Sequence, residues 1–313
     1  SSRLSAHKTG GAARRQCGWM RCVKTCRSLL TYACPGYTRL GSRAVSGTAA
    51  LRTLPPETPS APSSLNMHGV GRHTRGAAKE IAMIQEGLNR RPPQRREADS
   101  RAVVACLLRP ASAAESESSS GLEIFYILRS VRPGEASRWA GQVAFPGGHV
   151  DTEESDHEAA VRECFEEIGL DLDALGAFRF LGCVRERIVP RRTSTLAVAC
   201  RVYLQLAAQE APLRPEPSEV AACGWAPLSV LLKEESVRPL QWSLHDPRDG
   251  KRWDGFPSVP LPMRDLTVAS SLPEDGIENK FILWGLTLSI VNDFLMAAQL
   301  RSSPIDLKPL SGL

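Results

Sequence analysis

The segment that most constrains the fold is a short helix whose two ends are both marked in the sequence. Ser155 and Glu158 have the spacing of a capping box, in which each side chain accepts a hydrogen bond from the other residue's backbone amide. Asp156 adds a negative charge to the first turn, where it interacts favourably with the helix dipole. Gly169 stands where a helix ends in a left-handed residue. We therefore predict a helix between Ser155 and Gly169.

Two sets of side chains are expected on opposite sides of this helix. The apolar stripe predicted from spacings of three, four and seven residues consists of Val161, Cys164, Phe165 and Ile168. The other side carries Glu163, Glu166 and Glu167, and like charges so spaced destabilise a helix by roughly 0.2–0.5 kcal/mol per pair. Charge runs on helices are usually solvated faces. This one does not mix signs, and convergent carboxylates are the ligands that a hard divalent cation requires.

The sequence around this helix, GHVDTEESDHEAAVRECFEEIGL (148–170), resembles the signature of Nudix hydrolases. That signature is G-x5-E-x5-[UA]-x-R-E-x2-E-E-x-G-U, where U is a bulky aliphatic residue. Every defined position matches, namely Gly148, Glu154, Ala160, Arg162, Glu163, Glu166, Glu167, Gly169 and Leu170. The resemblance implies a Nudix diphosphatase, a hydrolase that uses Mg²⁺ or Mn²⁺ on a nucleoside diphosphate linked to another group.

The resemblance also assigns a role to each carboxylate. Glu163, Glu166 and Glu167 would bind the cation, together with the backbone carbonyl of Gly147 or Gly148. The cation would orient the diphosphate and lower the pKa of an attacking water.

Arg162 and Glu166 are further catalytic candidates. Arg162 would hold the carboxylates by charge-assisted hydrogen bonds, and Glu154 would anchor Arg162 or the loop before the helix. The proton of the attacking water needs an acceptor, for which Glu163 and Glu219 are the candidates. Glu219 lies just ahead of the apolar run VAACGWAPL, and its alternative interpretation is an ordinary surface glutamate.

Upstream residues resemble those of Nudix enzymes that split coenzyme A. The matching residues are Arg129, Ser130, Arg132, Arg138 and the stretch AGQVAFPGG (140–148). The three arginines would bind the substrate, and FILWGLTLSI (281–290) resembles the closing segment of the same enzymes. The gap between Ser130 and Gly141 is longer than in that pattern, and Arg138 stands one place closer to Gly141.

Several activities are compatible with these residues. The leading hypothesis is hydrolysis of coenzyme A or acyl-coenzyme A to phosphopantetheine and adenosine 3′,5′-bisphosphate. The alternatives are a Nudix hydrolase of oxidised deoxynucleotides, ADP-ribose or dinucleoside polyphosphates, and a non-catalytic nucleotide-binding protein of the same fold. The intact REx2EE motif disfavours the last, because a pure sensor could lose any of the three glutamates. The expected partner is a small nucleotide, and the oligomeric state is open.

The fold implied is the Nudix α/β/α sandwich with a mixed sheet. We expect a leader and linker over residues 1–75 and a Nudix domain over 76–313, with a core at about 98–232. A C-terminal excursion and helix would occupy 233–300, with Trp242 and Trp253 either stacking on a base or packing.

Three helices and four strands are predicted outside the residues already discussed. Helices are expected at 76–89, in PLSVLLKEE and at 279–300, and strands at 102–109, 125–130, in GAFRFLGCVRE and in TLAVACRVYLQLA. GQVAFPGG (141–148) is expected to form one strand that ends in a turn. The last helix is apolar, but Asn292 and Asp293 favour a packed core helix over a membrane span.

Charge divides the chain into two parts. Residues 1–56 hold ten Lys or Arg and no acid, whereas the remainder has 29 basic and 34 acidic residues. The pI near 8.8 therefore reflects the leader, and we expect no nucleic-acid binding by the enzyme. A basic, acid-free leader is typical of a mitochondrial transit peptide. The alternatives are import into another organelle, a cytoplasmic protein with a disordered extension, and translated sequence upstream of a start at Met67.

The nine cysteines and two of the six histidines also bear on the choice of metal. The chain has no C-x2-C pair, so zinc is not expected and buried thiols of a reducing compartment are the default. His149 and His157 flank the proposed metal loop, but a hard cation has little use for imidazole, and both are expected at the surface.

Overall fold

The computed structural model describes residues 72–111, 120–131, 139–206, 212–241, 244–245, 252–253, 255–269 and 276–308. These residues belong to one compact unit, residues 64–313. Several predictions lie outside the described residues: those for the disordered leader and its import signal, Arg132, Arg138, Trp242 and the side chain of Trp253.

The described residues form four α-helices, two short 3-10 helices (η) and thirteen strands. In chain order these are α1 (Arg72–Arg90), β1 (Ser100–Pro110), β2 (Leu122–Arg129), β3 (Val143–Ala144), β4 (Gly147–His149), α2 (Asp156–Ile168), β5 (Phe178–Pro190), β6 (Thr195–Gln205), β7 (Val220–Pro227), α3 (Ser229–Leu232), η2 (Glu234–Ser236), β8 (Arg238–Pro239), β9 (Leu244–His245), β10 (Arg252–Trp253), β11 (Pro257–Pro260), β12 (Arg264–Val268), η3 (Glu278–Lys280), β13 (Ile282–Trp284) and α4 (Gly285–Ala297).

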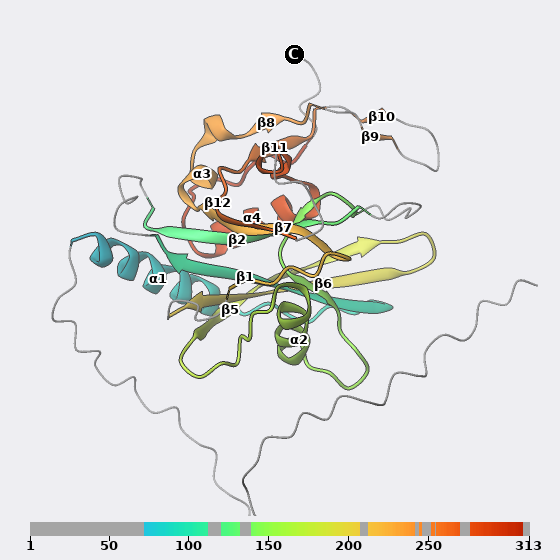
Figure 1. Ribbon diagram of the computed structural model, residues 1–313, viewed down its shortest axis with the longest axis horizontal. Coiled ribbons are helices and arrows are strands. Elements are labelled where there is room, and N and C mark those ends of the chain that lie inside the picture. Colours follow the sequence, from blue (N-terminus) through green and yellow to red (C-terminus); the bar gives the residue numbers. More distant parts are fainter. Residues whose placement is uncertain are drawn as a thin grey trace, which may run out of the picture. The chain divides into compact units, whose positions relative to one another are not determined.

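An eight-stranded sheet organises these elements (Figure 1). Its strand order is β12-β7-β2-β1-β6-β5, with β3 added beside β2 and β4 beside β1. The central strands β1 and β6 run parallel, from the pair Ser100–Leu196 to the pair Leu108–Leu204. The other pairings in this sheet are antiparallel. The mixed sheet that the resemblance implies is therefore confirmed.

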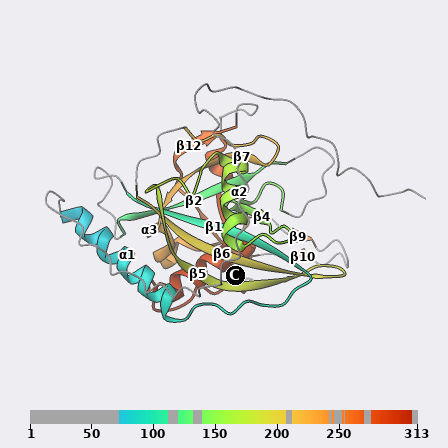
Figure 2. The same ribbon diagram turned by 90° about the horizontal axis from the view of Figure 1, so that it is seen from below.

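Helices cover both faces of the sheet (Figures 1 and 2). On one face, Ala160, Cys164 and Ile168 of α2 pack into one apolar cluster. On the other face, Leu88 of α1 and Phe294 of α4 belong to a larger cluster. Burial of apolar surface stabilises the fold by about 25 cal/mol per Å², so each layer is held by its own core. This arrangement confirms the predicted α/β/α sandwich.

The stretch GQVAFPGG forms two short strands instead of the single strand predicted. β3 pairs with β2, whereas β4 pairs with β1. Pro146 lies between them, and its carbonyl accepts a hydrogen bond of 2.8 Å from the amide of Ala105. Proline has no amide with which to continue a strand ladder. The break lets the chain leave β2 and reach β1 within a few residues.

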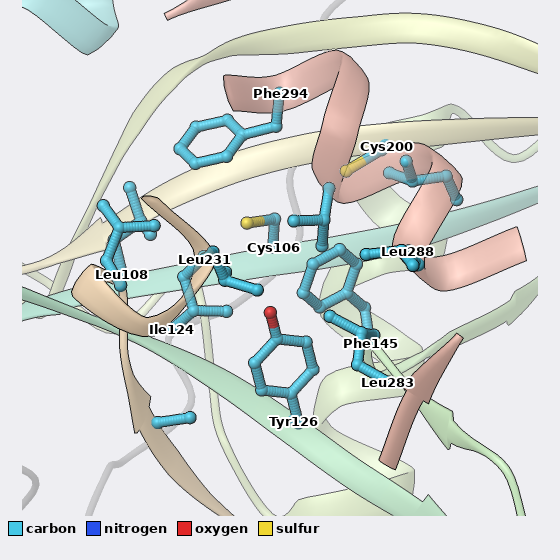
Figure 3. Close-up of a cluster of buried hydrophobic side chains, with 14 of the residues drawn as sticks. Cys106, Leu108, Ile124, Tyr126, Phe145, Cys200, Leu231, Leu283, Leu288 and Phe294 are labelled. Atoms are coloured by element: carbon cyan, nitrogen blue, oxygen red, sulfur yellow. The ribbon is translucent and has the colours of Figure 1, made fainter. Parts of the chain in front are cut away.

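Phe145 anchors this break in the larger core (Figure 3). Its ring stacks on Tyr126 of β2, with centroids 5.3 Å apart and planes 15° apart. Leu283 and Leu288 lie on the same side of the sheet (Figure 3). Thr287 of α4 donates a hydrogen bond of 3.0 Å to the carbonyl of Val143. The strand pair before the predicted metal loop is therefore fixed from the face opposite α2.

The C-terminal apolar segment is shorter as a helix than predicted. Residues 282–284 form β13, which pairs with β11, and α4 begins only at Gly285, whose φ is 62°. Asn292 is buried and exchanges hydrogen bonds with the backbone of Ile305, which supports the predicted packed core helix. Among the helices described, none is both long and apolar enough to cross a membrane.

The cysteines of the described domain are free thiols. Cys106, Cys164, Cys200 and Cys223 are buried as predicted, and Cys183 is half-buried. Burial raises the pKa of Cys223 to about 12, and it raises the pKa of the other three buried thiols as well. These groups are therefore protonated core side chains at neutral pH.

Candidate active site

The helix that carries the carboxylates begins and ends where the sequence predicts. Ser155 caps α2 by accepting a hydrogen bond of 3.2 Å from the amide of Glu158, and the Glu158 carboxylate accepts one of 2.8 Å from the amide of Ser155. Gly169 has a φ of 74°, and its amide is bonded to carbonyls of the last turn. The capping box and the glycine stop are confirmed.

The buried face of α2 matches the predicted stripe only in part, because Cys164 and Ile168 are buried but Phe165 is not. Phe165, expected in the apolar stripe, has 56% of its surface exposed. Glu167, expected on the outer side with the other two glutamates, is buried. The residues of α2 that are buried are Ala159, Ala160, Cys164, Glu167 and Ile168. Positions 160, 164 and 167 have the same helical spacing as the predicted stripe, so the carboxylate of Glu167 occupies a place in the core.

Arg162 joins three carboxylates to the loop before the helix. Its guanidinium donates hydrogen bonds of 2.8 and 2.9 Å to Glu154, 2.9 Å to Glu163 and 3.2 Å to Glu166. A further hydrogen bond of 2.9 Å reaches the carbonyl of His149. The predicted contact with Glu154 is present, and hydrogen bonding from Arg162 lowers the pKa of Glu154. All three nitrogens of this guanidinium donate hydrogen bonds to groups of the protein.

Glu167 lacks a strong cationic partner. Its side chain is 2% exposed, and it accepts a hydrogen bond of 2.9 Å from the amide of Gly147. The nearest guanidinium nitrogen, that of Arg129, lies 3.7 Å away. Burial raises the pKa of Glu167 to about 8 against the opposing effects of Gly147 and Arg129. The negative charges of Glu163 and Glu219 raise it further.

Glu163 lies beside Glu167 but has an ion-pair partner, Arg162, at 2.9 Å. Burial raises the pKa of Glu163, while Arg162 opposes the shift and the charges of Glu166 and Glu219 add to it. Glu166 differs, because 58% of its side chain is exposed. The two inner glutamates are therefore carboxylates whose ionisation is unfavourable without added positive charge.

Two glycines allow the backbone to approach this pair. A Cβ on Gly148 would lie 2.3 Å from a carboxylate oxygen of Glu163. A Cβ on Gly147, whose φ is 145°, would lie 2.2 Å from the carbonyl oxygen of Val103. A side chain at Gly147 would meet backbone atoms, and one at Gly148 would displace the carboxylate of Glu163, so the Gly147–Gly148 backbone lies directly against the carboxylates. These are the two glycines whose carbonyls the resemblance proposes as metal ligands.

Glu219, predicted from its place ahead of β7, lies in a turn beside the same pair. Its amide donates a hydrogen bond of 2.9 Å to the carbonyl of Glu216. The amide of Glu216 in turn donates one of 2.9 Å to the carbonyl of Glu167. The negative charge of Glu219 raises the pKa of both Glu163 and Glu167. The turn therefore brings a further carboxylate to the site from a distant part of the chain.

Two contacts near the site have no signal in the sequence. Ser130 donates a hydrogen bond of 2.8 Å from its hydroxyl to the carbonyl of Pro217. Arg191, at the tip between β5 and β6, lies 3.1 Å from the imidazole of His149. His149 is exposed as predicted. His157 is half-buried, lying 3.0 Å from both Tyr203 and Asp173.

The oxygen atoms gathered here are the type of ligand that a hard divalent cation binds. The burial of Glu167 is unfavourable until a cation neutralises it. Among the described residues, however, no three His, Cys, Asp or Glu side chains lie close enough together to hold an ion. Arg162 holds Glu163 and Glu166, and the amide of Gly147 holds Glu167. The carboxylates thus lie in one region, but each accepts hydrogen bonds from groups of the protein.

Comparison with known proteins finds a family model that is similar to this region. The model of the NUDIX domain matches residues 101–245. That range contains α2, the loop before it, Arg129 and Glu219, together with the central strands of the sheet.

Two curated relatives and one solved structure illustrate the similarity. An uncharacterized protein of Schizosaccharomyces pombe is 33% identical over 120 residues, covering 38% of this chain and 36% of its own length. The m7GpppN-mRNA hydrolase NUDT17 of Danio rerio is 36% identical over 92 residues, covering 26% and 30%. The chain thus spans about a third of the length of these relatives. A crystal structure of a C. elegans Ap4A hydrolase binary complex aligns at 17% identity and a TM-score of 0.31, over 40% of this chain and 78% of that one.

Proposed function

Because residues 101–245 match the model of the NUDIX domain, we propose that this chain is a metal-dependent hydrolase of nucleoside diphosphate-linked compounds. The favoured substrates are coenzyme A and acyl-coenzyme A, which would be cleaved to phosphopantetheine and adenosine 3′,5′-bisphosphate. One observation carries the proposal: two inner carboxylates, Glu163 and Glu167, are held against a glycine backbone without enough positive charge to balance them.

The cation, Mg²⁺ or Mn²⁺, would be held by the inner carboxylates, by Glu166 and by a carbonyl of Gly147 or Gly148. When bound, it would supply charge neutralisation on the diphosphate oxygens and a lowered pKa for the attacking water. Arg162 is a positioning residue in this scheme. Its guanidinium is occupied by carboxylates and a carbonyl, so it orients Glu163 and takes no direct part in substrate binding.

Two other residues complete the proposed machinery. Glu219 lies beside both inner carboxylates and would accept the proton of the attacking water. Glu163 remains the second candidate for this base. Arg129 has one weak carboxylate contact, at 3.7 Å, and a third of its side chain is exposed. It would donate hydrogen bonds to a phosphate oxygen of the bound substrate.

The choice of coenzyme A rests on the resemblance of Arg129, Ser130 and residues 140–148 to enzymes with that substrate. The position of this stretch is consistent with a functional role, because Phe145 anchors it in the core, Gly148 lies against Glu163, and the amide of Gly147 donates a hydrogen bond to Glu167. A second candidate function follows from the zebrafish relative, whose name describes hydrolysis of m7GpppN-mRNA. Capped RNA also contains phosphoanhydride bonds and would meet the same carboxylates.

A substrate panel tests the proposal. The purified chain is incubated with Mg²⁺ or Mn²⁺ and with coenzyme A, acyl-coenzyme A, ADP-ribose, NADH, diadenosine polyphosphates, oxidised dGTP and capped RNA, and the products are separated by chromatography. We expect the highest kcat/KM with coenzyme A compounds and 3′,5′-bisphosphate as a product. A preference for another compound would overturn the coenzyme A assignment. Lack of turnover with every compound would favour a binding protein of the same fold.

We also propose that residues 1–66 direct the chain to mitochondria. Fusion of this segment to a fluorescent reporter should give mitochondrial signal because it is basic and free of acids over its first 56 residues. Diffuse cytosolic signal would contradict this proposal.

A further inference from the structure

The turn at residues 216–219 bridges two elements that are far apart in the sequence. One side is bonded to the end of α2, and the other side is bonded to Ser130, the residue after β2. We propose that Ser130 is a positioning residue that holds Glu219 at the metal site. This inference rests on the proposed function and adds to it the element that places the general base.

Two hydrogen bonds to the end of α2 fix the position of the turn along the helix axis. The amide of Arg214 donates a hydrogen bond of 3.0 Å to the carbonyl of Ile168, and the amide of Glu216 donates one of 2.9 Å to the carbonyl of Glu167. Carbonyls at the end of a helix lack partners within it. Arg214, just before the turn, and Glu216, within it, supply these partners, and the carbonyl bonded to Glu216 belongs to Glu167, a proposed metal ligand.

Ser130 sets the position of the turn across the sheet. Its hydroxyl donates a hydrogen bond of 2.8 Å to the carbonyl of Pro217, and its amide donates one of 2.8 Å to the carbonyl of Glu219. The serine therefore grips the turn at two carbonyls that flank a single residue. Replacement of the serine by alanine would leave the amide contact and remove the hydroxyl contact.

The pairing of β2 with β7 shows why the turn needs this extra contact. Leu128 pairs with Ala222, whereas the next residue, Arg129, pairs with Val220. The register shift leaves Ala221, the second residue after the turn, without a paired residue on β2, and such irregularities bend a strand. The ladder alone does not fix Glu219, so the Ser130 hydroxyl supplies an additional restraint at that point.

Adjacent residues of one strand end thus serve two parts of the site. Arg129 points toward Glu167, at 3.7 Å, and Ser130 holds the turn that presents Glu219. Side chains of neighbouring residues in an extended segment point in opposite directions. An arginine-serine pair at this position can therefore bind the substrate through the arginine and hold the turn that carries the general base through the serine.

The test is a double-mutant cycle in the full chain with its best substrate and metal. Ser130→Ala should lower kcat about tenfold or more with little change in KM, because small displacements of a reacting group reduce the rate strongly. Ser130→Thr keeps the hydroxyl and should restore most of kcat. In a Glu219→Gln background, Ser130→Ala should have no further effect. An equal loss in both backgrounds would overturn the proposal.

Hydrogen exchange provides a readout that does not depend on turnover. The amides of Glu219 and Val220 are bonded to the carbonyl of Glu216, and Ser130→Ala should make peptides covering 216–220 exchange several-fold faster. Unchanged exchange would overturn the proposal even if activity fell. Faster exchange in a chain that turns over no substrate would refute the proposed function while leaving the structural role of Ser130 intact.

Two further variants guard against misinterpretation. Ser130→Cys keeps nearly the same volume with a weak donor, and it replaces the alanine variant if that chain does not fold. It should behave like the alanine variant in both measurements, and wild-type behaviour would overturn the proposal. Ser303→Ala is the matched control, because Ser303 is an exposed serine near the C-terminus. It should leave kcat and exchange unchanged.

Discussion

Two glutamates of this domain are buried to nearly the same degree but have opposite surroundings. Glu123, at the start of β2, has a fully buried side chain, and its two oxygens accept hydrogen bonds of 2.7 Å from Arg109 and 3.0 Å from Arg264. Glu167, on α2, is 2% exposed and has one backbone amide and a guanidinium 3.7 Å away. The first carboxylate is neutralised by the protein, and the second is not.

The difference separates a structural role from a proposed functional one. Arg264 belongs to β12, so Glu123 ties the edge strand of the sheet to β2. An unbalanced buried carboxylate, by contrast, lowers stability unless something else supplies the positive charge. Glu167 stands on a packed helix, beside Glu163 and the glycine backbone. Burial alone therefore does not distinguish the two residues, whereas the balance of charge around them does.

The largest expected effect is the loss of activity in Glu167→Gln. Glutamine keeps the volume and can still accept the hydrogen bond from Gly147, but it cannot ligate a cation as a carboxylate does. We expect kcat to fall about a thousandfold, which corresponds to about 4 kcal/mol of transition-state stabilisation, while the free energy of unfolding stays the same or rises. Steady-state kinetics and urea unfolding measure the two quantities. A fully active variant would refute the metal assignment.

The same substitution at the paired glutamate should have the reverse outcome. Glu123→Gln leaves Arg109 and Arg264 without their shared anion, and breaking such a pair lowers the free energy of unfolding by about 3 kcal/mol. Specific activity at low temperature should stay close to wild type, because the residue lies outside the site. Urea unfolding at 10 °C checks the stability. If Glu123→Gln were stable but turned over substrate poorly, Glu123 would have a functional and not a structural role.

Stabilisation by a bound cation should also distinguish Glu167→Gln from Glu123→Gln. Mg²⁺ or Mn²⁺ at a hundred times its dissociation constant would stabilise the wild-type fold by about 2.7 kcal/mol. The shift of thermal midpoint should persist in Glu123→Gln and vanish in Glu167→Gln. Ca²⁺ and EDTA serve as the comparison conditions. Equal shifts in both variants would place the cation elsewhere.

The smallest expected effect is an acid-dependent loss of stability at a third ionic cluster. Although burial opposes it, hydrogen bonding from Arg101 lowers the pKa of Asp156 and of Glu186. Carboxylates with lowered folded-state pKa values contribute stability above their unfolded values, near pH 4, and lose it as the pH falls through the folded values. We expect a loss on the order of 1 kcal/mol between pH 5 and 3.

Urea unfolding across this pH range measures that loss, and Arg101→Gln is the variant to compare. The two carboxylates would then lack their guanidinium, so this part of the acid dependence should disappear. If Arg101→Gln and wild type show the same pH profile, the cluster is not the source of the acid sensitivity.

Much of the fold and part of the site could be predicted because the relevant signals are local. The capping box, the glycine stop and the glutamate spacing all lie within about twenty residues. The orientation of α2 was predicted wrongly in part, since apolar periodicity alone ranks Phe165 above Glu167 as a buried residue. A proposed metal ligand violates that ranking because it must face the sheet, and proteins tend to break local rules at such sites.

Other features depend on contacts that no local pattern records. The hydroxyl of Ser130 meets the carbonyl of Pro217 across 87 positions of the sequence. The break of residues 141–148 into two strands depends on β1 accepting β4 as a partner. Glu219 could be proposed from its place ahead of an apolar run, but its nearness to Glu163 follows from the way the turn is bonded to α2.

The absence of a side chain at Gly148 has an evolutionary consequence. Even a single methyl group there would meet the carboxylate of Glu163, so alanine at this position would force that proposed metal ligand to move. A gene duplicate with alanine or serine at this position is therefore expected to have a displaced Glu163 even if all of its glutamates are retained.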